Sequence, residues 1–128
     1  MTVFAIYGTF GSTQGGHANM RGAELLESVR TAPAYRLYRV DDRWPALVRA
    51  VDGVEIEVEL YECTEEHLAR LAALEPPGWN REALALEDGR EVEAFIGDKS
   101  LVARGVDVSE HGSWAAHVAS RASRQRLH

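Results

Sequence analysis

The stretch that most constrains the fold is residues 54–60, where apolar and acidic residues alternate without exception. The acidic residues occupy every second position: Glu55, Glu57 and Glu59. Because successive side chains of a β-strand point to opposite faces, this alternation predicts a strand with an apolar face on the core and an acidic face in solvent. A functional alternative places Glu57 or Glu59 at the mouth of a pocket, paired with Arg36 or Arg39 across the sheet.

A second constrained stretch lies near the N-terminus. Residues 3–7 are β-branched and aromatic, which predicts a short strand, and they run directly into the glycine-rich residues 8–17. Such a loop can gather backbone N–H groups into a concave nest that accepts a carboxylate or phosphate. No Lys-Ser/Thr pair follows the glycines, so a nucleotide phosphate is not the expected anion. The candidate ligand-binding residues are Tyr7, Gly8, Thr9, Phe10 and Gly11. The alternative is a flexible connector.

The remaining pattern predicts an α+β fold. A short helix is expected over residues 23–29, and a terminal helix is expected after a Ser113 N-cap, with Val118 on its apolar side. Further strands are expected over residues 35–40, 44–48, 82–86 and 91–96, with hairpin turns at Asp52-Gly53 and Asp88-Gly89. We therefore predict a small mixed, mainly antiparallel sheet curled into a barrel, with flanking helices.

A helix with recognisable ends precedes the second hairpin. Thr64 suits the N-cap, and Pro76-Pro77 stops the helix, which makes Glu75 its last residue. The apolar stripe of this helix comprises Leu68, Leu71 and Leu74. A carboxylate at Glu75 faces the negative end of the helix dipole, and burial in an apolar pocket adds to this effect. Both effects raise the pKa toward the range of a general acid or base. The alternative is an exposed glutamate at a helix end.

Length and charge narrow the classes of function. The 128 residues suit one domain, expected over residues 1–120 and followed by a polar, basic tail over residues 121–128. The net charge of −6 argues against a nucleic-acid partner. No apolar run reaches membrane-spanning length and no signal peptide is recognisable, so a cytoplasmic protein without a membrane partner is expected. The single cysteine, Cys63, excludes a cysteine-cluster zinc site, and His111 and His117 match no common metal spacing. We expect no metal or other cofactor.

Four segments, taken in order, resemble the signature elements of the gamma-glutamylcyclotransferase-like superfamily. They are similar to its Tyr-Gly-Ser/Thr-Leu, Tyr-Pro-Ala-Leu, Gly-Glu-Leu/Val-Tyr and Leu-Asp-x-Leu/Gln-Glu motifs, and they occupy residues 7–10, 44–48, 59–61 and 71–75. Within that fold, the chain resembles the C-terminal domain of allophanate hydrolases over nearly its whole length. The segments that carry this likeness are residues 31–38, 56–59, 86–92, 107–109 and 112–114.

The resemblance implies two chemistries. Cyclotransferases of this superfamily hold the α-carboxylate of a γ-glutamyl compound on the loop that matches Tyr7–Phe10. The glutamate that matches Glu75 moves a proton while the substrate's α-amino nitrogen attacks its own γ-carbonyl and releases an amine. The allophanate hydrolase domain is instead associated with removing carbon dioxide from a carboxylated urea, for which His17 is the best-placed proton donor. Allophanate hydrolase domains commonly have an apolar residue where this chain has Glu75, which favours the first chemistry.

A third alternative is a non-catalytic binding or assembly module, for which a homodimer is the expected assembly. In each of the three cases, the expected partner is a small carboxylate-bearing molecule.

Overall fold

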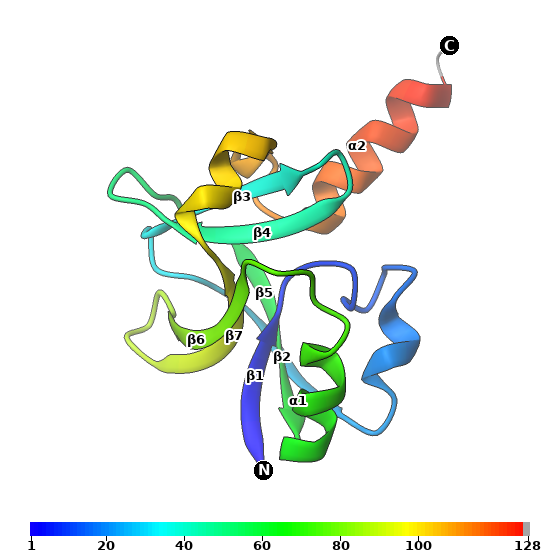
Figure 1. Cartoon of the computed structure of the whole chain (residues 1–128), viewed down its shortest axis with the longest axis vertical. Helices are drawn as coiled ribbons and strands as arrows, with labels where there is room; N and C mark the ends of the chain where they lie inside the picture. Colours follow the sequence, from blue (N-terminus) through cyan, green and yellow to red (C-terminus); the bar gives the residue numbers. More distant parts are fainter. Residues whose placement is uncertain (127–128) are drawn as a thin grey trace.

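The strands of the computed structural model, which describes residues 1–126, form two sheets (Figure 1). The larger sheet has the order β2-β5-β1-β7-β6 and the smaller one β4-β3-β8. The strand bounds are β1 Thr2–Ile6, β2 Glu24–Arg30, β3 Tyr35–Val40, β4 Trp44–Arg49, β5 Glu57–Cys63, β6 Trp79–Ala85, β7 Glu91–Gly97 and β8 Gly105–Asp107. Neighbouring strands run antiparallel, apart from the parallel pair β1 and β7. The predicted mixed, mainly antiparallel α+β fold is confirmed, but the two sheets do not close into a barrel.

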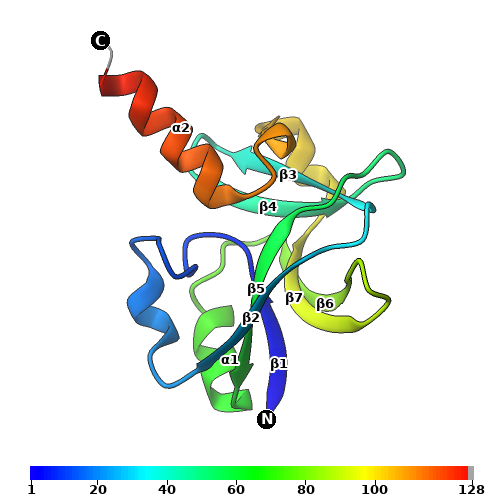
Figure 2. The same ribbon diagram turned by 180° about the vertical axis from the view of Figure 1, so that it is seen from behind.

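Helices flank the sheets, and the two views agree that α2 extends away from them (Figures 1 and 2). The α-helices are α1 Glu65–Ala72 and α2 Trp114–Arg126, and the 3₁₀-helices are η1 His17–Met20, η2 Lys99–Arg104 and η3 Ser109–His111. Within residues 1–126, none of the helices has both the length and the apolar character needed to cross a membrane. The tail predicted from residue 121 begins inside α2, and its residues 127–128 lie outside the described part of the chain.

Residues 57–60 of the alternating stretch begin β5, which lies between β2 and β1 in the larger sheet. Val58 and Leu60 of β5 are buried and Glu57 is exposed, as the pattern predicts. Glu57 and Glu59 line a cavity, as the functional alternative places one of them, but within residues 1–126 neither forms an ion pair with Arg36 or Arg39. Arg36 lies 3.3 Å from Asp107 and Arg39 lies 2.9 Å from Asp42, because β3 belongs to the smaller sheet and pairs with β4 and β8.

Residues 23–29 do not form the predicted helix. Residues 24–29 instead belong to β2, an edge strand that pairs antiparallel with β5 and has a bulge between Leu25 and Glu27. The backbone of β5 offers a ladder of hydrogen bonds to this segment, and tertiary pairing of this kind overrides a weak helical preference. Leu25 and Leu26 are exposed on this edge strand, so the spacing of the apolar residues does not mark a core-facing side.

The two predicted hairpin turns have different outcomes. Asp88-Gly89 joins β6 to β7 as predicted, with Gly89 at a φ of 90°. Asp52-Gly53 does not make a hairpin, because it carries the chain from β4 in the smaller sheet to β5 in the larger one. A Cβ atom on Gly53 would lie 2.3 Å from the backbone nitrogen of Tyr35, so glycine is required there by close approach rather than by a hairpin.

Both predicted N-caps are confirmed, whereas other details of the helices differ. The Thr64 hydroxyl accepts a hydrogen bond from the His67 N–H, and the Ser113 hydroxyl accepts one from the Ala116 N–H. Helix α1 ends at Ala72, so Glu75 is not its last residue. Leu74 is 53% exposed and Val118 is 37% exposed, which contradicts their predicted core-facing positions. The buried positions of α2 are instead Trp114 and His117.

The hydroxyl of Tyr7 links the two sheets. It donates a hydrogen bond to the Phe95 carbonyl of β7 at 2.6 Å and accepts one from the Leu47 N–H of β4 at 3.1 Å. Phe95 and Leu47 are both buried. A single side chain therefore satisfies one backbone group in each sheet at the point where they meet.

We expect Tyr7→Phe to lower the free energy of unfolding by about 1–3 kcal/mol, because it leaves a buried N–H and a buried carbonyl without their partner. The measurement is urea denaturation followed by circular dichroism. Tyr38→Phe is the matched control, since Tyr38 is half-buried and its hydroxyl has no hydrogen-bond partner within residues 1–126. Equal losses in the two variants would contradict a bridging role for Tyr7.

Candidate functional site

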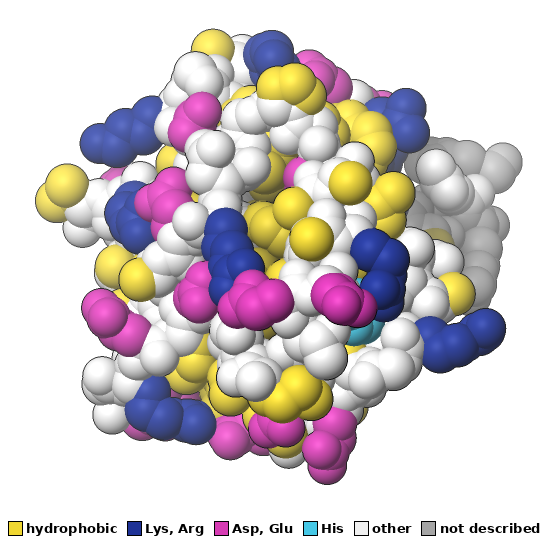
Figure 3. Space-filling model, turned by 60° about the horizontal axis from the view of Figure 1, so that its bottom comes forward, with side chains coloured by type: hydrophobic (Ala, Val, Ile, Leu, Met, Phe, Trp, Pro, Cys, Tyr) yellow, Lys and Arg dark blue, Asp and Glu magenta, His cyan; other side chains and the backbone are white. Residues whose placement is uncertain are grey.

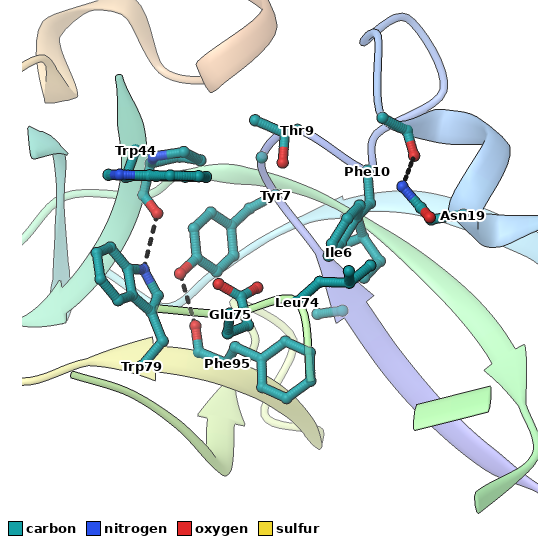
Figure 4. A pocket seen from close by; sticks show the side chains of 14 residues that line it. Ile6, Tyr7, Thr9, Phe10, Asn19, Trp44, Leu74, Glu75, Trp79 and Phe95 are labelled. Carbon is teal, nitrogen blue, oxygen red and sulfur yellow. Dashed lines mark hydrogen bonds between the residues drawn. The ribbon is translucent and has the colours of Figure 1, made fainter. Parts of the chain in front are cut away.

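A cavity of about 270 Å³ separates the loop after β1 from the segment after α1. Its lining combines the start of the glycine-rich loop with the first two residues of β4 and the turn that precedes β6 (Figure 4). The lining residues are Ala5, Ile6, Tyr7, Gly8, Thr9, Phe10, Gly16, Asn19, Trp44, Pro45, Leu74, Glu75, Trp79 and Phe95. The sequence-predicted residues Tyr7, Gly8, Thr9, Phe10 and Glu75 therefore come together in one pocket.

The loop at the pocket is folded on itself by its own backbone. The Gly11 N–H donates to the Gly8 carbonyl and the Gly16 N–H donates to the Thr9 carbonyl, each at 2.9 Å. Within residues 1–126, the N–H groups of Gly8, Thr9 and Phe10 donate to no protein acceptor. Three consecutive N–H groups beside a cavity can accept an anion. The loop thus retains the donors that a carboxylate needs.

Close packing explains the glycine at the start of this loop. A Cβ atom on Gly8 would lie 2.4 Å from the Cγ atom of Pro45, which lines the same pocket. The carbonyl of Pro45 in turn accepts a hydrogen bond from the Trp79 indole N–H at 2.9 Å. The loop, β4 and β6 are therefore held together at the pocket by direct contacts.

Glu75 is the acidic side chain of the pocket, and in Figure 4 its carboxylate lies among the side chains of Tyr7, Leu74 and Phe95. Burial raises the pKa of Glu75 to about 7, because removal from water disfavours the charged form. The helix dipole invoked from the sequence is not the cause, since α1 ends three residues earlier. At neutral pH this carboxyl can either take up or release a proton.

The hydroxyl of Tyr7 is a poor candidate for proton transfer. Burial raises its pKa well above the usual range, the hydrogen bond from the Leu47 N–H opposes this shift, and the nearby charge of Glu75 adds to it. Both hydrogen bonds of the hydroxyl go to backbone groups. Tyr7 therefore contributes structure to the pocket, and Glu75 is the group in it that titrates near neutral pH.

Aromatic rings form much of the wall. Trp44, Trp79 and Phe95 line the cavity, and the Arg43 guanidinium lies 4.3 Å from the centre of the Trp44 ring. The sequence suggested Trp79 as a pocket residue because it follows Pro76-Pro77. It did not suggest Trp44 or Phe95 as pocket residues. Trp44 could have been found from the Trp-Pro start of its motif, whereas Phe95 lies in an ordinary strand pattern without a distinguishing signal.

Two predicted site residues lie elsewhere. His17 lines a separate cavity beside Tyr61, and its Nδ1 atom is 3.0 Å from the Phe10 carbonyl. Gly11 lines another cavity, on the side of the loop that faces Glu59. The structure thus keeps Tyr7–Phe10 together with Glu75 and leaves His17 and Gly11 outside the pocket.

No basic side chain or metal cluster lines the pocket. Its lining contains no Lys, Arg or His, and within residues 1–126 no three His, Cys, Asp or Glu side chains are grouped as metal ligands. In Figure 3, hydrophobic side chains are exposed in a hollow at the centre of the face shown, and acidic and basic side chains lie next to one another around it. Anion binding in the pocket would rest on backbone N–H groups.

The chain matches a known family over almost its whole length. Residues 2–119 match the family described as the allophanate hydrolase C-terminal domain. A solved uropathogenic E. coli-specific protein is 28% identical, with a TM-score of 0.85 over 92% of this chain and 95% of that one. No curated protein sequence matches the chain.

Two further solved structures share the fold. Kluyveromyces lactis allophanate hydrolase is 22% identical, with a TM-score of 0.86 over 93% of this chain and 21% of that one. This chain therefore spans about a fifth of that enzyme. An AIG2-like protein from Mus musculus is 24% identical, with a TM-score of 0.64 over 79% of this chain and 78% of that one. The resemblance to the allophanate hydrolase C-terminal domain is confirmed by the family match, and the AIG2-like protein shares the fold.

We expect Glu75→Gln to stabilise the fold at pH 8 and to have little effect near pH 4. The pKa of Glu75 rises from 4.5 to about 7 on folding, so the unfolded chain ionises first and stability falls as pH rises through this interval. The difference between the variant and the wild type should reach about 3 kcal/mol at pH 8. Urea denaturation at several pH values measures it.

Glu66→Gln is the control for this prediction, because Glu66 is exposed on α1. A difference between Glu75→Gln and wild type that did not change with pH would show that Glu75 ionises normally in the folded protein.

Proposed function

Because this chain belongs to the family of allophanate hydrolase C-terminal domains, we propose that its pocket binds a small carboxylate-bearing amide and that Glu75 transfers a proton during the reaction. The observation that carries the proposal is the position of Glu75, whose pKa is about 7, across a cavity from the N–H groups of Gly8, Thr9 and Phe10. One end of the pocket thus offers hydrogen-bond donors and the other offers a proton carrier.

The substrate carboxylate is held by the backbone N–H groups of the loop. These donors carry no net charge, so they bind an anion without lowering the pKa of Glu75 as a Lys or Arg would. The apolar lining excludes water, and this strengthens hydrogen bonds to the carboxylate. The cavity volume of about 270 Å³ also leaves room beyond the carboxylate for an amide and the group attached to it.

The reaction best supported by these parts is intramolecular aminolysis. The neutral α-amino nitrogen of the substrate attacks its own γ-carbonyl carbon, and the Glu75 carboxylate accepts the proton that this nitrogen loses. The same proton is then given to the nitrogen of the leaving amine as its C–N bond breaks. A bound conformation that brings amine and carbonyl together supplies much of the rate enhancement, so one acid–base group and an anchored carboxylate suffice.

Family membership favours a second candidate, the decarboxylation of a carboxylated urea. Here the bond between nitrogen and the carboxylate carbon breaks, the electron pair stays on nitrogen, and carbon dioxide leaves. Protonated Glu75 would give its proton to that nitrogen, because His17 lines a different cavity. A carboxyl group with a pKa of about 7 is present in both forms at neutral pH, so it can serve either reaction.

We expect Glu75→Gln to lower kcat about 10²–10⁴-fold on any substrate found by screening γ-glutamyl amines and carboxylated ureas, the usual contribution of a general acid or base. Product release is measured by chromatography of the free amine or by carbon dioxide detection. Glu66→Gln should retain the wild-type rate. Full turnover by Glu75→Gln would exclude Glu75 as the proton carrier. A complete absence of turnover by the wild type in this screen would favour a non-catalytic binding module.

The pH dependence separates the two chemistries. Aminolysis requires ionised Glu75, so kcat/KM should rise with pH through about 7. Decarboxylation requires the protonated form, so kcat/KM should fall through the same pH. The profile is measured with buffers of constant ionic strength from pH 5 to pH 9, and a profile without an inflection near pH 7 would contradict both assignments.

A further inference from the structure

Glu59 binds the glycine-rich loop from the side opposite the Glu75 pocket. It lies on β5 directly across from Ile6, the last residue of β1. Its carboxylate accepts a hydrogen bond from the Ser12 N–H at 2.7 Å and a second from the Ser12 hydroxyl. The Tyr61 hydroxyl donates to the same carboxylate at 3.2 Å. Tyr61 is buried, so Glu59 is itself anchored to the core.

Ser12 directly follows the turn that contains Gly8, Thr9 and Phe10, whose N–H groups donate to no protein acceptor within residues 1–126. That turn is closed by the hydrogen bond from the Gly11 N–H to the Gly8 carbonyl. A glycine-rich segment loses much conformational freedom when it is fixed, so the loop needs contacts that hold it in one conformation. Hydrogen bonds to a carboxylate are among the stronger ones available. The contact between Glu59 and Ser12 supplies this restraint one residue beyond the turn.

We propose that Glu59 is a positioning residue for the carboxylate-binding loop, acting through Ser12 to hold the N–H groups of Gly8, Thr9 and Phe10 toward the pocket. The effect on carboxylate binding rests on the proposed function, whereas the restraint on the loop can be tested without any ligand. Glu59 does not line the Glu75 pocket, and it is therefore separate from the proton carrier.

The first test is amide hydrogen exchange of the ligand-free protein, followed by NMR at Gly11 and Gly16, whose N–H groups close the loop. Glu59→Ala should accelerate exchange at these two amides about tenfold or more, because a charged hydrogen-bond partner is lost. Glu57→Ala is the matched control, since this exposed residue lies on the same face of β5. Unchanged protection in Glu59→Ala would overturn the inference.

Ser12→Ala provides a second variant that keeps the β5 strand intact and removes only the hydroxyl contact. It should accelerate exchange at Gly11 and Gly16 by a smaller factor, about threefold. This variant keeps the inference testable if Glu59→Ala does not fold. If Glu59→Ala does not fold and Ser12→Ala protects these two amides as well as the wild type does, the inference is overturned.

The second test uses L-glutamate as the carboxylate probe and follows the amide shifts of Gly8, Thr9 and Phe10. Glu59→Ala should weaken binding about tenfold while the pKa of Glu75 stays near 7. Glu59→Gln should recover part of the affinity, because its amide oxygen can still accept from the Ser12 N–H. Equal affinity in wild type and Glu59→Ala would overturn the positioning role. If the exchange result holds and wild type does not bind glutamate, the restraint stands and the proposed carboxylate site fails.

Discussion

The pocket depends on the contact between the two sheets, and the Tyr7 hydroxyl is the polar link in that contact. Tyr7 directly follows β1, so the residue that joins the sheets also begins the loop that carries the free N–H groups. Its two partners belong to β4 and β7, the strands that bring Trp44, Pro45 and Phe95 to the pocket. Fixing the sheets relative to one another therefore also fixes the distance across the cavity. Tyr7 therefore both joins the two sheets and begins the loop that carries the candidate binding groups.

Burial of Glu75 lowers the stability of the folded state at high pH. Its carboxyl group is largely removed from water and has no ion-pair partner within residues 1–126, so the charged form is disfavoured in the folded state. A chain selected for stability alone would be expected to place an apolar residue there. The segment from Leu74 to Pro76-Pro77 turns the chain away from α1 and into β6, and this turn points the carboxylate at the cavity. The path of the chain between α1 and β6 therefore determines the position of the Glu75 carboxylate.

Local patterns in the sequence predicted the local structure well, because they report short-range physics. The β5 alternation, the Thr64 cap and the Asp88-Gly89 hairpin each depend on residues close in sequence. Residues 23–29 became a strand because of pairing with β5, which no local window contains. The motifs also predicted that Glu75 lies near the loop after β1, and both line the same pocket. Trp44 and Phe95 reach the pocket from β4 and β7, which belong to different sheets, so the sequence did not predict them as pocket residues.

The order of strands in the larger sheet has a consequence for how the chain reaches its native state. Strand β1 is made first, yet it lies between β5 and β7, which follow much later in the chain. Such long-range pairing requires large loops to close before contacts form, which slows folding relative to helical proteins. During synthesis, residues 2–6 must wait with unpaired backbone groups until β5 and β7 have left the ribosome. The apolar segment that leads into the pocket is therefore open to pairing with other chains during that interval.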